Sequence, residues 1–115
     1  MNKRIVGSFY EEMAINYLTT NGFVILETNY SCKIGEIDII AKKDATIHFV
    51  EVKYRKNNDF GYASEAVSKS KFNKIIRCAN FFINENKLHN NAISIDVIAI
   101  TGDKLEFFDN CFGGM

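Results

Sequence analysis

The sequence predicts an α/β domain in which a mixed β-sheet is flanked by helices. Two long segments carry apolar residues at helical spacing, and five short runs have the apolar character of strands. These segments are interleaved in the order α-β-β-β-α-β-β, which favours one mixed sheet. The length of 115 residues and the hydrophobic content of 47% suit a single domain over residues 1–115 with a substantial core.

The first half of the chain is expected to contain one helix and three strands. Apolar residues recur at helical spacing over residues 4–20, and Asn21-Gly22 ends this helix. The strand-like runs that follow are residues 23–30, 35–41 and 46–54. A short polar turn, "KKDA", joins the last two into a hairpin.

The second half supplies the connection that returns the chain to the sheet. A loop over residues 55–64 is expected to lead into a long amphipathic helix over residues 65–87. A fourth strand is predicted over residues 92–100 and a fifth over residues 104–109, separated by the turn "TGD".

Composition excludes several classes of protein. Fourteen acidic residues balance fourteen basic ones, and no apolar run approaches the roughly 20 residues of a membrane-spanning helix. The start, "MNKRIVGSFYEE", turns acidic and amphipathic, unlike a signal peptide. Cys32, Cys78 and Cys111 form no CxxC pair, which favours free buried thiols. A soluble cytoplasmic domain is expected.

Charged residues interrupt the apolar runs of the predicted hairpin. A turn centred on residues 44–45 places Asp38 directly opposite Glu51 and Glu36 opposite Lys53. Opposed Cβ atoms lie roughly 5 Å apart, and two carboxylates so placed repel by about 3 kcal/mol at an effective dielectric near 20. Protonation or a bound hard divalent cation would relieve this repulsion. A bulged turn would break the pairing.

Strand alternation adds a second constraint, because Glu51, Lys53 and Arg55 project from one face. A carboxylate and an ammonium therefore lie side by side. The alternative interpretation is a cross-strand ion pair between Glu36 and Lys53 on a solvated face.

The pattern Asp-x12-Glu-x-Lys in a βββα context resembles the PD-(D/E)xK nucleases, which include restriction endonucleases and archaeal Holliday-junction resolvases. A wider set of residues is similar to the bacterial YraN family over almost the whole chain. That set comprises Gly7, Glu11, Ala14, Tyr17-Leu18, Gly22, Asn29, Gly35-Glu36-Ile37-Asp38, Phe49-Val50-Glu51-Val52-Lys53, Arg55, Phe60-Gly61, Ala66-Val67, Lys71, Asp96-Val97, Asn110 and Phe112. Family members often have a glycine where this chain has Tyr10. The resemblance implies a restriction-endonuclease-like core.

The same resemblance implies roles for the hairpin residues. Asp38, Glu51 and the carbonyl of Val52 would hold Mg²⁺ or Mn²⁺, which activates water and relieves phosphate charge. Lys53 would orient or deprotonate that water. Glu11 borders the apolar stripe of the first helix and matches the helix glutamate that joins the metal cluster in resolvase-like nucleases. The alternative for Glu11 is a solvated first-turn glutamate favoured by the helix dipole.

Basic residues predict a phosphate-binding edge. Lys71, Lys74 and Arg77 follow one another at intervals of three along the long helix, and Arg55 and Lys56 could extend the same face. Contacts of this kind would give salt-sensitive, sequence-independent binding to nucleic acid. A merely solvated helix face is the alternative, and Lys71 is favoured as the exception because it borders the apolar stripe.

Two polar residues within predicted strands are expected to have structural roles. Asp96 is expected to be a buried partner for a lysine or a backbone amide, and His48 a half-exposed pairing residue. No Ser-His-Asp arrangement, phosphate-binding glycine loop or zinc-ligand spacing is visible in the sequence.

The first functional hypothesis is a metal-dependent endonuclease that hydrolyses DNA, including branched or flapped structures. Two alternatives stay open: a non-catalytic nucleic-acid-binding or adaptor module, and a protein-interaction domain with a vestigial acidic pocket. Because junction resolvases need two sites for two symmetric nicks, a homodimer joins DNA among the expected partners. No membrane partner is expected.

Overall fold

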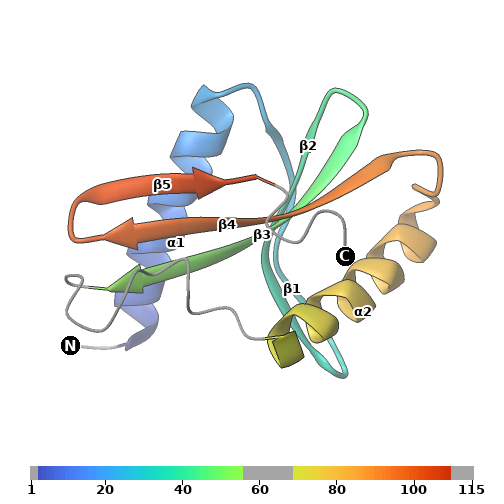
Figure 1. Ribbon diagram of the computed structural model, residues 1–115, viewed down its shortest axis with the longest axis horizontal. Helices are drawn as coiled ribbons and strands as arrows, with labels where there is room; N and C mark the ends of the chain where they lie inside the picture. The colour runs from blue at the N-terminus through green and yellow to red at the C-terminus, as the bar shows by residue number, and fades with distance from the viewer. Residues whose placement is uncertain (1–2, 56–68, 110–115) are drawn as a thin grey trace.

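The computed structural model describes the backbone of residues 3–55 and 69–109, and the side chains of residues 8–55 and 69–109. The predicted order of elements is confirmed (Figure 1). In chain order the elements are α1 (Lys3–Thr20), β1 (Val24–Cys32), β2 (Gly35–Lys43), β3 (Thr46–Arg55), α2 (Lys69–Asn86), β4 (Ala92–Thr101) and β5 (Lys104–Phe108).

The strands of the described residues form one mixed sheet in the order β1-β2-β3-β4-β5. β3 and β4 are parallel, whereas every other neighbouring pair is antiparallel. A parallel pair requires a crossover connection, and α2 lies in the segment that joins β3 to β4. The predicted α/β class with a mixed sheet and flanking helices is therefore confirmed.

Each helix covers its own hydrophobic cluster on the sheet. Leu18 of α1 packs with Val50 of β3 and Ile98 of β4. On the other side, Phe82 of α2 packs with Phe49 of β3. The side chains of β3 alternate between the two clusters, as a strand covered on both faces requires.

The predicted register of the β2-β3 hairpin is confirmed over its paired residues. Lys43 pairs with Thr46 at the turn, and Ile39 pairs with Val50 at the other end of the ladder. Asp44, in the turn, has φ of 55°, a left-handed conformation that aspartate tolerates better than most residues. The predicted oppositions of Asp38 to Glu51 and of Glu36 to Lys53 lie beyond the last recorded pair.

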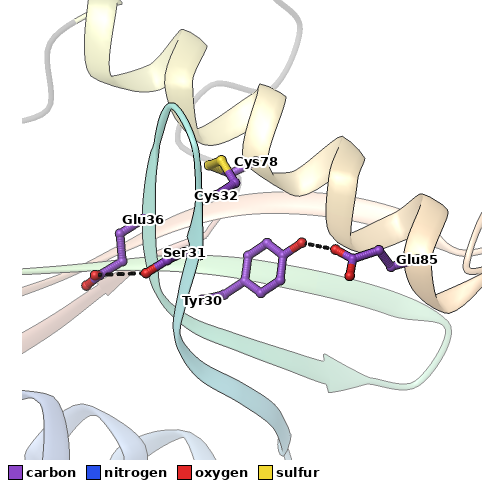
Figure 2. Close-up of a disulfide and its surroundings, with 6 residues drawn as sticks. All are labelled: Tyr30, Ser31, Cys32, Glu36, Cys78 and Glu85. Carbon is purple, nitrogen blue, oxygen red and sulfur yellow. Dashed lines mark hydrogen bonds between the residues drawn. A yellow bond between two sulfur atoms is a disulfide. The ribbon is translucent and has the colours of Figure 1, made fainter.

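The prediction of free buried thiols is wrong for two of the three cysteines. Cys32 at the end of β1 and Cys78 of α2 form a disulfide, and their Cα atoms are 6.0 Å apart (Figure 2). The pair is separated by 46 residues, so only the packing of α2 on the sheet brings the two thiols within bridging distance. Next to it, the Tyr30 hydroxyl donates a hydrogen bond to Glu85 of α2.

His48 and Asp96 correct a second expectation. His48 is 7% exposed rather than half-exposed, because the Phe23 ring packs edge-on against it at a centroid distance of 4.9 Å. Asp96 is fully buried, as predicted, and its partners include His48 and Ser94 rather than only a lysine or a backbone amide. Both residues lie on central strands that are covered on both faces.

Several predictions lie outside the described residues. These are the loop after Arg55, the role of Lys56, the state of Cys111, and the family-pattern residues Phe60, Gly61, Ala66, Val67, Asn110 and Phe112. Within the described residues, no helix is long and apolar enough to cross a membrane.

Candidate functional site

The candidate site begins where the pairing of β2 with β3 ends. The last recorded pair is Ile39 with Val50, and the next residues outward are Asp38 and Glu51. Asp38 Oδ2 accepts a hydrogen bond of 2.8 Å from the backbone amide of Val52. This bond from strand backbone to side chain holds the Asp38 carboxylate against β3.

Glu51 is the most deeply buried acidic group of this site, with a relative exposure of 5%. Its Oε1 atom lies 2.7 Å from Lys71 Nζ and 3.8 Å from Lys53 Nζ. Its Oε2 atom is buried and has no hydrogen-bond partner within the described part of the chain. A buried carboxylate oxygen without a partner is energetically unfavourable, so this atom is well suited to bind a cation.

Glu11 brings a third carboxylate from α1. It is half-buried and its Oε1 atom accepts a hydrogen bond of 2.8 Å from Asn29 Nδ2, whereas the neighbouring Glu12 is exposed. The predicted difference between the two glutamates is confirmed. Asn29 has φ of 52°, a left-handed conformation that asparagine adopts more readily than most residues.

The electrostatics of the cluster raise the pKa of Asp38 to about 7. Burial is the largest cause, and the charge of Glu51 adds to it, while the Val52 amide and the Lys71 ammonium act in the opposite direction. Burial also raises the pKa of Glu11, against the lowering effect of its bond from Asn29. Carboxylates crowded in this way gain most from a bound cation.

The surroundings shift the pKa values of Lys53 and Lys71 in opposite directions. Burial and the neighbouring Lys71 ammonium lower the pKa of Lys53, and these effects outweigh the charges of Glu51 and Asp38. Burial alone would lower the pKa of Lys71, but its contact with Glu51 raises it overall. Lys53 is therefore the lysine that releases a proton more readily.

The predicted site residues separate into two groups in the structure. Glu11, Asp38, Glu51, Lys53 and Lys71 come together, whereas Arg77 and Lys74 are exposed on α2. The structure pairs the Lys71 ammonium with Glu51, and the predicted role of Lys71 as a phosphate ligand stays a prediction.

The remaining predicted residues have different surroundings. Val52 reaches the cluster through its amide, and the metal-binding role of its carbonyl stays a prediction. Arg55 is partly exposed, and its buried Nε atom has no hydrogen-bond partner among the residues that the structure describes. The sequence identifies Asn29 only as part of the family pattern and does not predict its contact with Glu11.

A hollow of about 320 Å³ adjoins the cluster between β2 and the start of α2. Its polar lining includes Glu36, Ser70, Lys71 and Lys74. Gly35 also lines this hollow, and a Cβ added to it would meet Cys78 Sγ of the disulfide at 3.8 Å. Figure 2 shows Glu36 on the β2 side of this turn, within hydrogen-bond reach of the Ser31 hydroxyl.

The donors of the cluster fit a hard divalent cation. Asp38, Glu51 and Glu11 offer oxygen atoms, and Mg²⁺ and Mn²⁺ prefer such ligands. The unpartnered Oε2 atom of Glu51 favours a cation here, and the raised pKa of Asp38, to which the Glu51 charge contributes, agrees with it. The Lys71 ammonium, which contacts Glu51, already offsets part of the negative charge of these carboxylates.

Comparison with known proteins identifies one family. The model of the uncharacterised protein family UPF0102 matches residues 10–100. A UPF0102 protein of Fusobacterium nucleatum is 44% identical over 114 residues, which cover 99% of this chain and 96% of the relative. A UPF0102 protein of Clostridioides difficile is 52% identical over 100 residues, which cover 87% and 88%. One from Sulfurihydrogenibium is 42% identical over 112 residues, which cover 97% of each chain.

Proposed function

The chain belongs to UPF0102, the uncharacterised family also called YraN, and we propose that it is a divalent-metal-dependent endonuclease acting on DNA. The observation that carries this proposal is the convergence of Asp38 and Glu51 beside Lys53, with Glu51 Oε2 buried and without a partner among the described residues. This arrangement supports metal binding and water activation at one point.

Mg²⁺ or Mn²⁺ would supply Lewis acidity and lower the pKa of bound water. Asp38 and Glu51 would hold the ion, with the carbonyl of Val52 and the carboxylate of Glu11 as further ligands. Asn29 supports this by fixing Glu11 through its amide. The Val52 amide orients Asp38 in the same way.

Lys53 would orient the attacking water and accept its proton. Its lowered pKa, caused by burial and by Lys71, favours this role near neutral pH. Lys71 now pairs with Glu51 at 2.7 Å, and a cation bound to Glu51 would free its ammonium to contact the phosphate. By analogy with PD-(D/E)xK nucleases, in-line attack would leave a 5′-phosphate.

The DNA backbone would follow the hollow between β2 and α2. Lys74 and Ser70 line it beside Lys71, and the exposed Arg77 lies further along the same helix. Because lysine and arginine contacts to phosphate carry no sequence information, recognition of DNA shape is expected to dominate. Branched DNA is accordingly the substrate to test first.

Cleavage of labelled branched, flapped and single-stranded DNA tests the proposal in the presence of Mg²⁺ or Mn²⁺. Wild type should cut at least one substrate, Asp38→Asn and Glu51→Gln should be inactive, and Lys53→Met should be slower by about 10²–10⁴-fold. Glu12→Gln is the matched control, because it removes an exposed carboxylate next to Glu11 and should leave cleavage unchanged. Equal cleavage by wild type and Asp38→Asn would mean that the activity comes from a contaminant.

A second candidate function is favoured by the Lys71–Glu51 ion pair at 2.7 Å. This pair neutralises Glu51 without a metal, as expected for a DNA-binding or adaptor module that keeps the fold. Metal-independent binding of DNA without cleavage would support this candidate. Absence of both binding and cleavage would leave a protein-interaction domain as the remaining hypothesis.

A further inference from the structure

A second cluster of ligand-type side chains lies on the α1 side of the sheet. His48 of β3, Asp96 of β4 and Asp109, which follows β5, each offer one ligand atom, and these atoms lie within 4.8 Å of one another. Ser94 of β4 lies among them. Glu51 and Lys53 project from the opposite face of β3 toward α2, so this cluster is separate from the candidate nuclease site.

The Ser94 hydroxyl cannot satisfy both of its carboxylate neighbours. Its Oγ atom lies 2.5 Å from Asp96 Oδ1 and 3.0 Å from Asp109 Oδ1. A hydroxyl group has one proton and can donate it to one of these oxygens only. In the contact with the second carboxylate, two oxygen atoms therefore lie close together without a proton between them. A cation or an additional proton would relieve this repulsion.

His48 adds a nitrogen donor to this set of oxygens. Its Nδ1 atom donates a hydrogen bond of 2.6 Å to Asp96 Oδ2, and Asp96 is fully buried. Burial of a carboxylate is strongly unfavourable unless it is paired or coordinates a metal. His48 gives Asp96 one such partner, and the Asp109 carboxylate lies beside the same serine hydroxyl.

One lysine lines the hollow beside this cluster, and its ammonium lies over an aromatic ring. This lysine is Lys43, and its Nζ atom lies 5.1 Å from the centroid of the Phe23 ring. The hollow has a volume of about 490 Å³, and His48, Ser94 and Asp109 form part of its wall. An ion can therefore reach the cluster from solvent, and water can complete its coordination.

We propose that His48, Asp96 and Asp109 bind a first-row divalent ion of the Zn²⁺ type, with Ser94 supporting both carboxylates. On loading, the proton between His48 Nδ1 and Asp96 Oδ2 passes to solvent. The two atoms then separate from 2.6 Å to about 3.3 Å, the spacing of two donors on a tetrahedral ion with bonds of roughly 2.0–2.1 Å. Asp109 is exposed, so its carboxylate can close on the ion with one oxygen while the other stays beside Ser94.

Ligand chemistry separates this site from the one proposed for catalysis. A set that contains an imidazole suits Zn²⁺, whereas an all-oxygen set suits Mg²⁺. The ion would also link β3 and β4 to the segment that follows β5, which gives it a structural role (Figure 1). The proposal does not depend on nuclease activity.

Titration of metal-free protein with Zn²⁺ and with Co²⁺ tests the proposal. The Asp38→Asn variant is the starting protein, because it removes binding at the candidate nuclease site. We expect one Zn²⁺ per chain, visible absorption bands of bound Co²⁺, and a shift of the His48 ring signals in the nuclear magnetic resonance spectrum.

Asp109→Asn, added to Asp38→Asn, should weaken Zn²⁺ binding by at least about 10-fold, the lower bound for residues that merely support metal ligands. Asp44→Asn is the matched control, because Asp44 lines the same hollow and loses the same charge. Affinity should be unchanged in that control. Circular dichroism verifies that each variant is folded.

Three results would overturn the proposal. They are no Zn²⁺ binding to the folded starting protein, equal affinity of the Asp109→Asn and Asp44→Asn variants, and unchanged His48 ring signals at saturating Zn²⁺. Loss of DNA cleavage in the proposed nuclease assay, with Zn²⁺ binding retained here, would concern the catalytic proposal alone.

Discussion

At the scale of single residues, the candidate nuclease site depends on the opposed environments of a few ionisable groups. Asp38 is raised to a pKa of about 7, chiefly by burial, whereas burial and a neighbouring ammonium lower the pKa of Lys53. Ionisable groups whose pKa values are shifted toward neutral pH are frequent at functional sites. The pKa shifts and the geometry of the cluster therefore point to the same site.

The pKa of Asp38 predicts how stability depends on pH. Between pH 3.8, the ordinary pKa of an aspartate, and about pH 7, the folded state holds the Asp38 proton that the unfolded state has released. The Asp38 contribution therefore reduces the free energy of unfolding as pH rises through this window. Asp38→Asn removes the effect and should be more stable than wild type at pH 8 by about 1–3 kcal/mol, since each pKa unit is worth about 1.4 kcal/mol and neighbouring charges share the shift.

Urea unfolding of wild type and Asp38→Asn at pH 5 and pH 8, without divalent metal, measures this difference. The gap between the two proteins should be small at pH 5 and larger at pH 8. A gap that does not change with pH would contradict the assigned titration of Asp38. Glu12→Gln serves again as the exposed control.

At the scale of elements, α2 is held to the sheet by both packing and a covalent bond. The Cys32–Cys78 disulfide joins it to the end of β1 (Figure 2). Lys71 on the same helix contacts Glu51 of the candidate site. The position of Lys71 is therefore coupled to an element that the disulfide restrains.

Reduction of this disulfide should lower the stability of the fold. A cross-link between residues separated by 46 positions is worth about 4 kcal/mol in the chain-entropy model. Wild type should therefore unfold at lower urea concentration when a reductant is present. Cys32→Ser should match reduced wild type and should not respond to reductant. Equal midpoints for oxidised and reduced wild type would contradict the prediction.

Local patterns in the sequence were sufficient to predict most of the helices and strands. Apolar periodicity predicted both helices, and the short turn at Asp44 fixed the register that pairs Ile39 with Val50. The Cys32–Cys78 pairing was missed because it depends on how α2 lies against β1. Periodicity specifies which face of an element is buried, but it does not specify which residues of a distant element meet that face.

The sequence likewise predicted only some of the contacts in the candidate site. The hairpin spacing was enough to bring Asp38 near Glu51, and the helical position of Glu11 correctly distinguished it from its neighbour Glu12. The bond from Asn29 to Glu11 was not foreseen, because it requires a left-handed residue on a different strand. The cluster at His48 was also missed, since its members come from three separate segments.

At the scale of the whole molecule, two clusters of ligand-type residues lie on opposite faces of the central strand β3. The cluster around Glu51 has oxygen donors, one of them from Glu11 of α1, and two lysines, whereas the cluster around His48 has a histidine with two aspartates. The hydrophobic clusters beneath α1 and α2 stabilise the fold itself. This division predicts that the two clusters bind different metals independently.

Binding of Mg²⁺ or Mn²⁺ to Asp38 and Glu51 is the central claim, and calorimetric titration at pH 8 tests it most directly. Wild type should bind the metal, Asp38→Asn and Glu51→Gln should not, and Glu12→Gln should bind as wild type does. Affinity should fall below about pH 7, where a proton competes for Asp38. Unchanged binding in Asp38→Asn, or no binding by folded wild type at millimolar metal, would contradict the account.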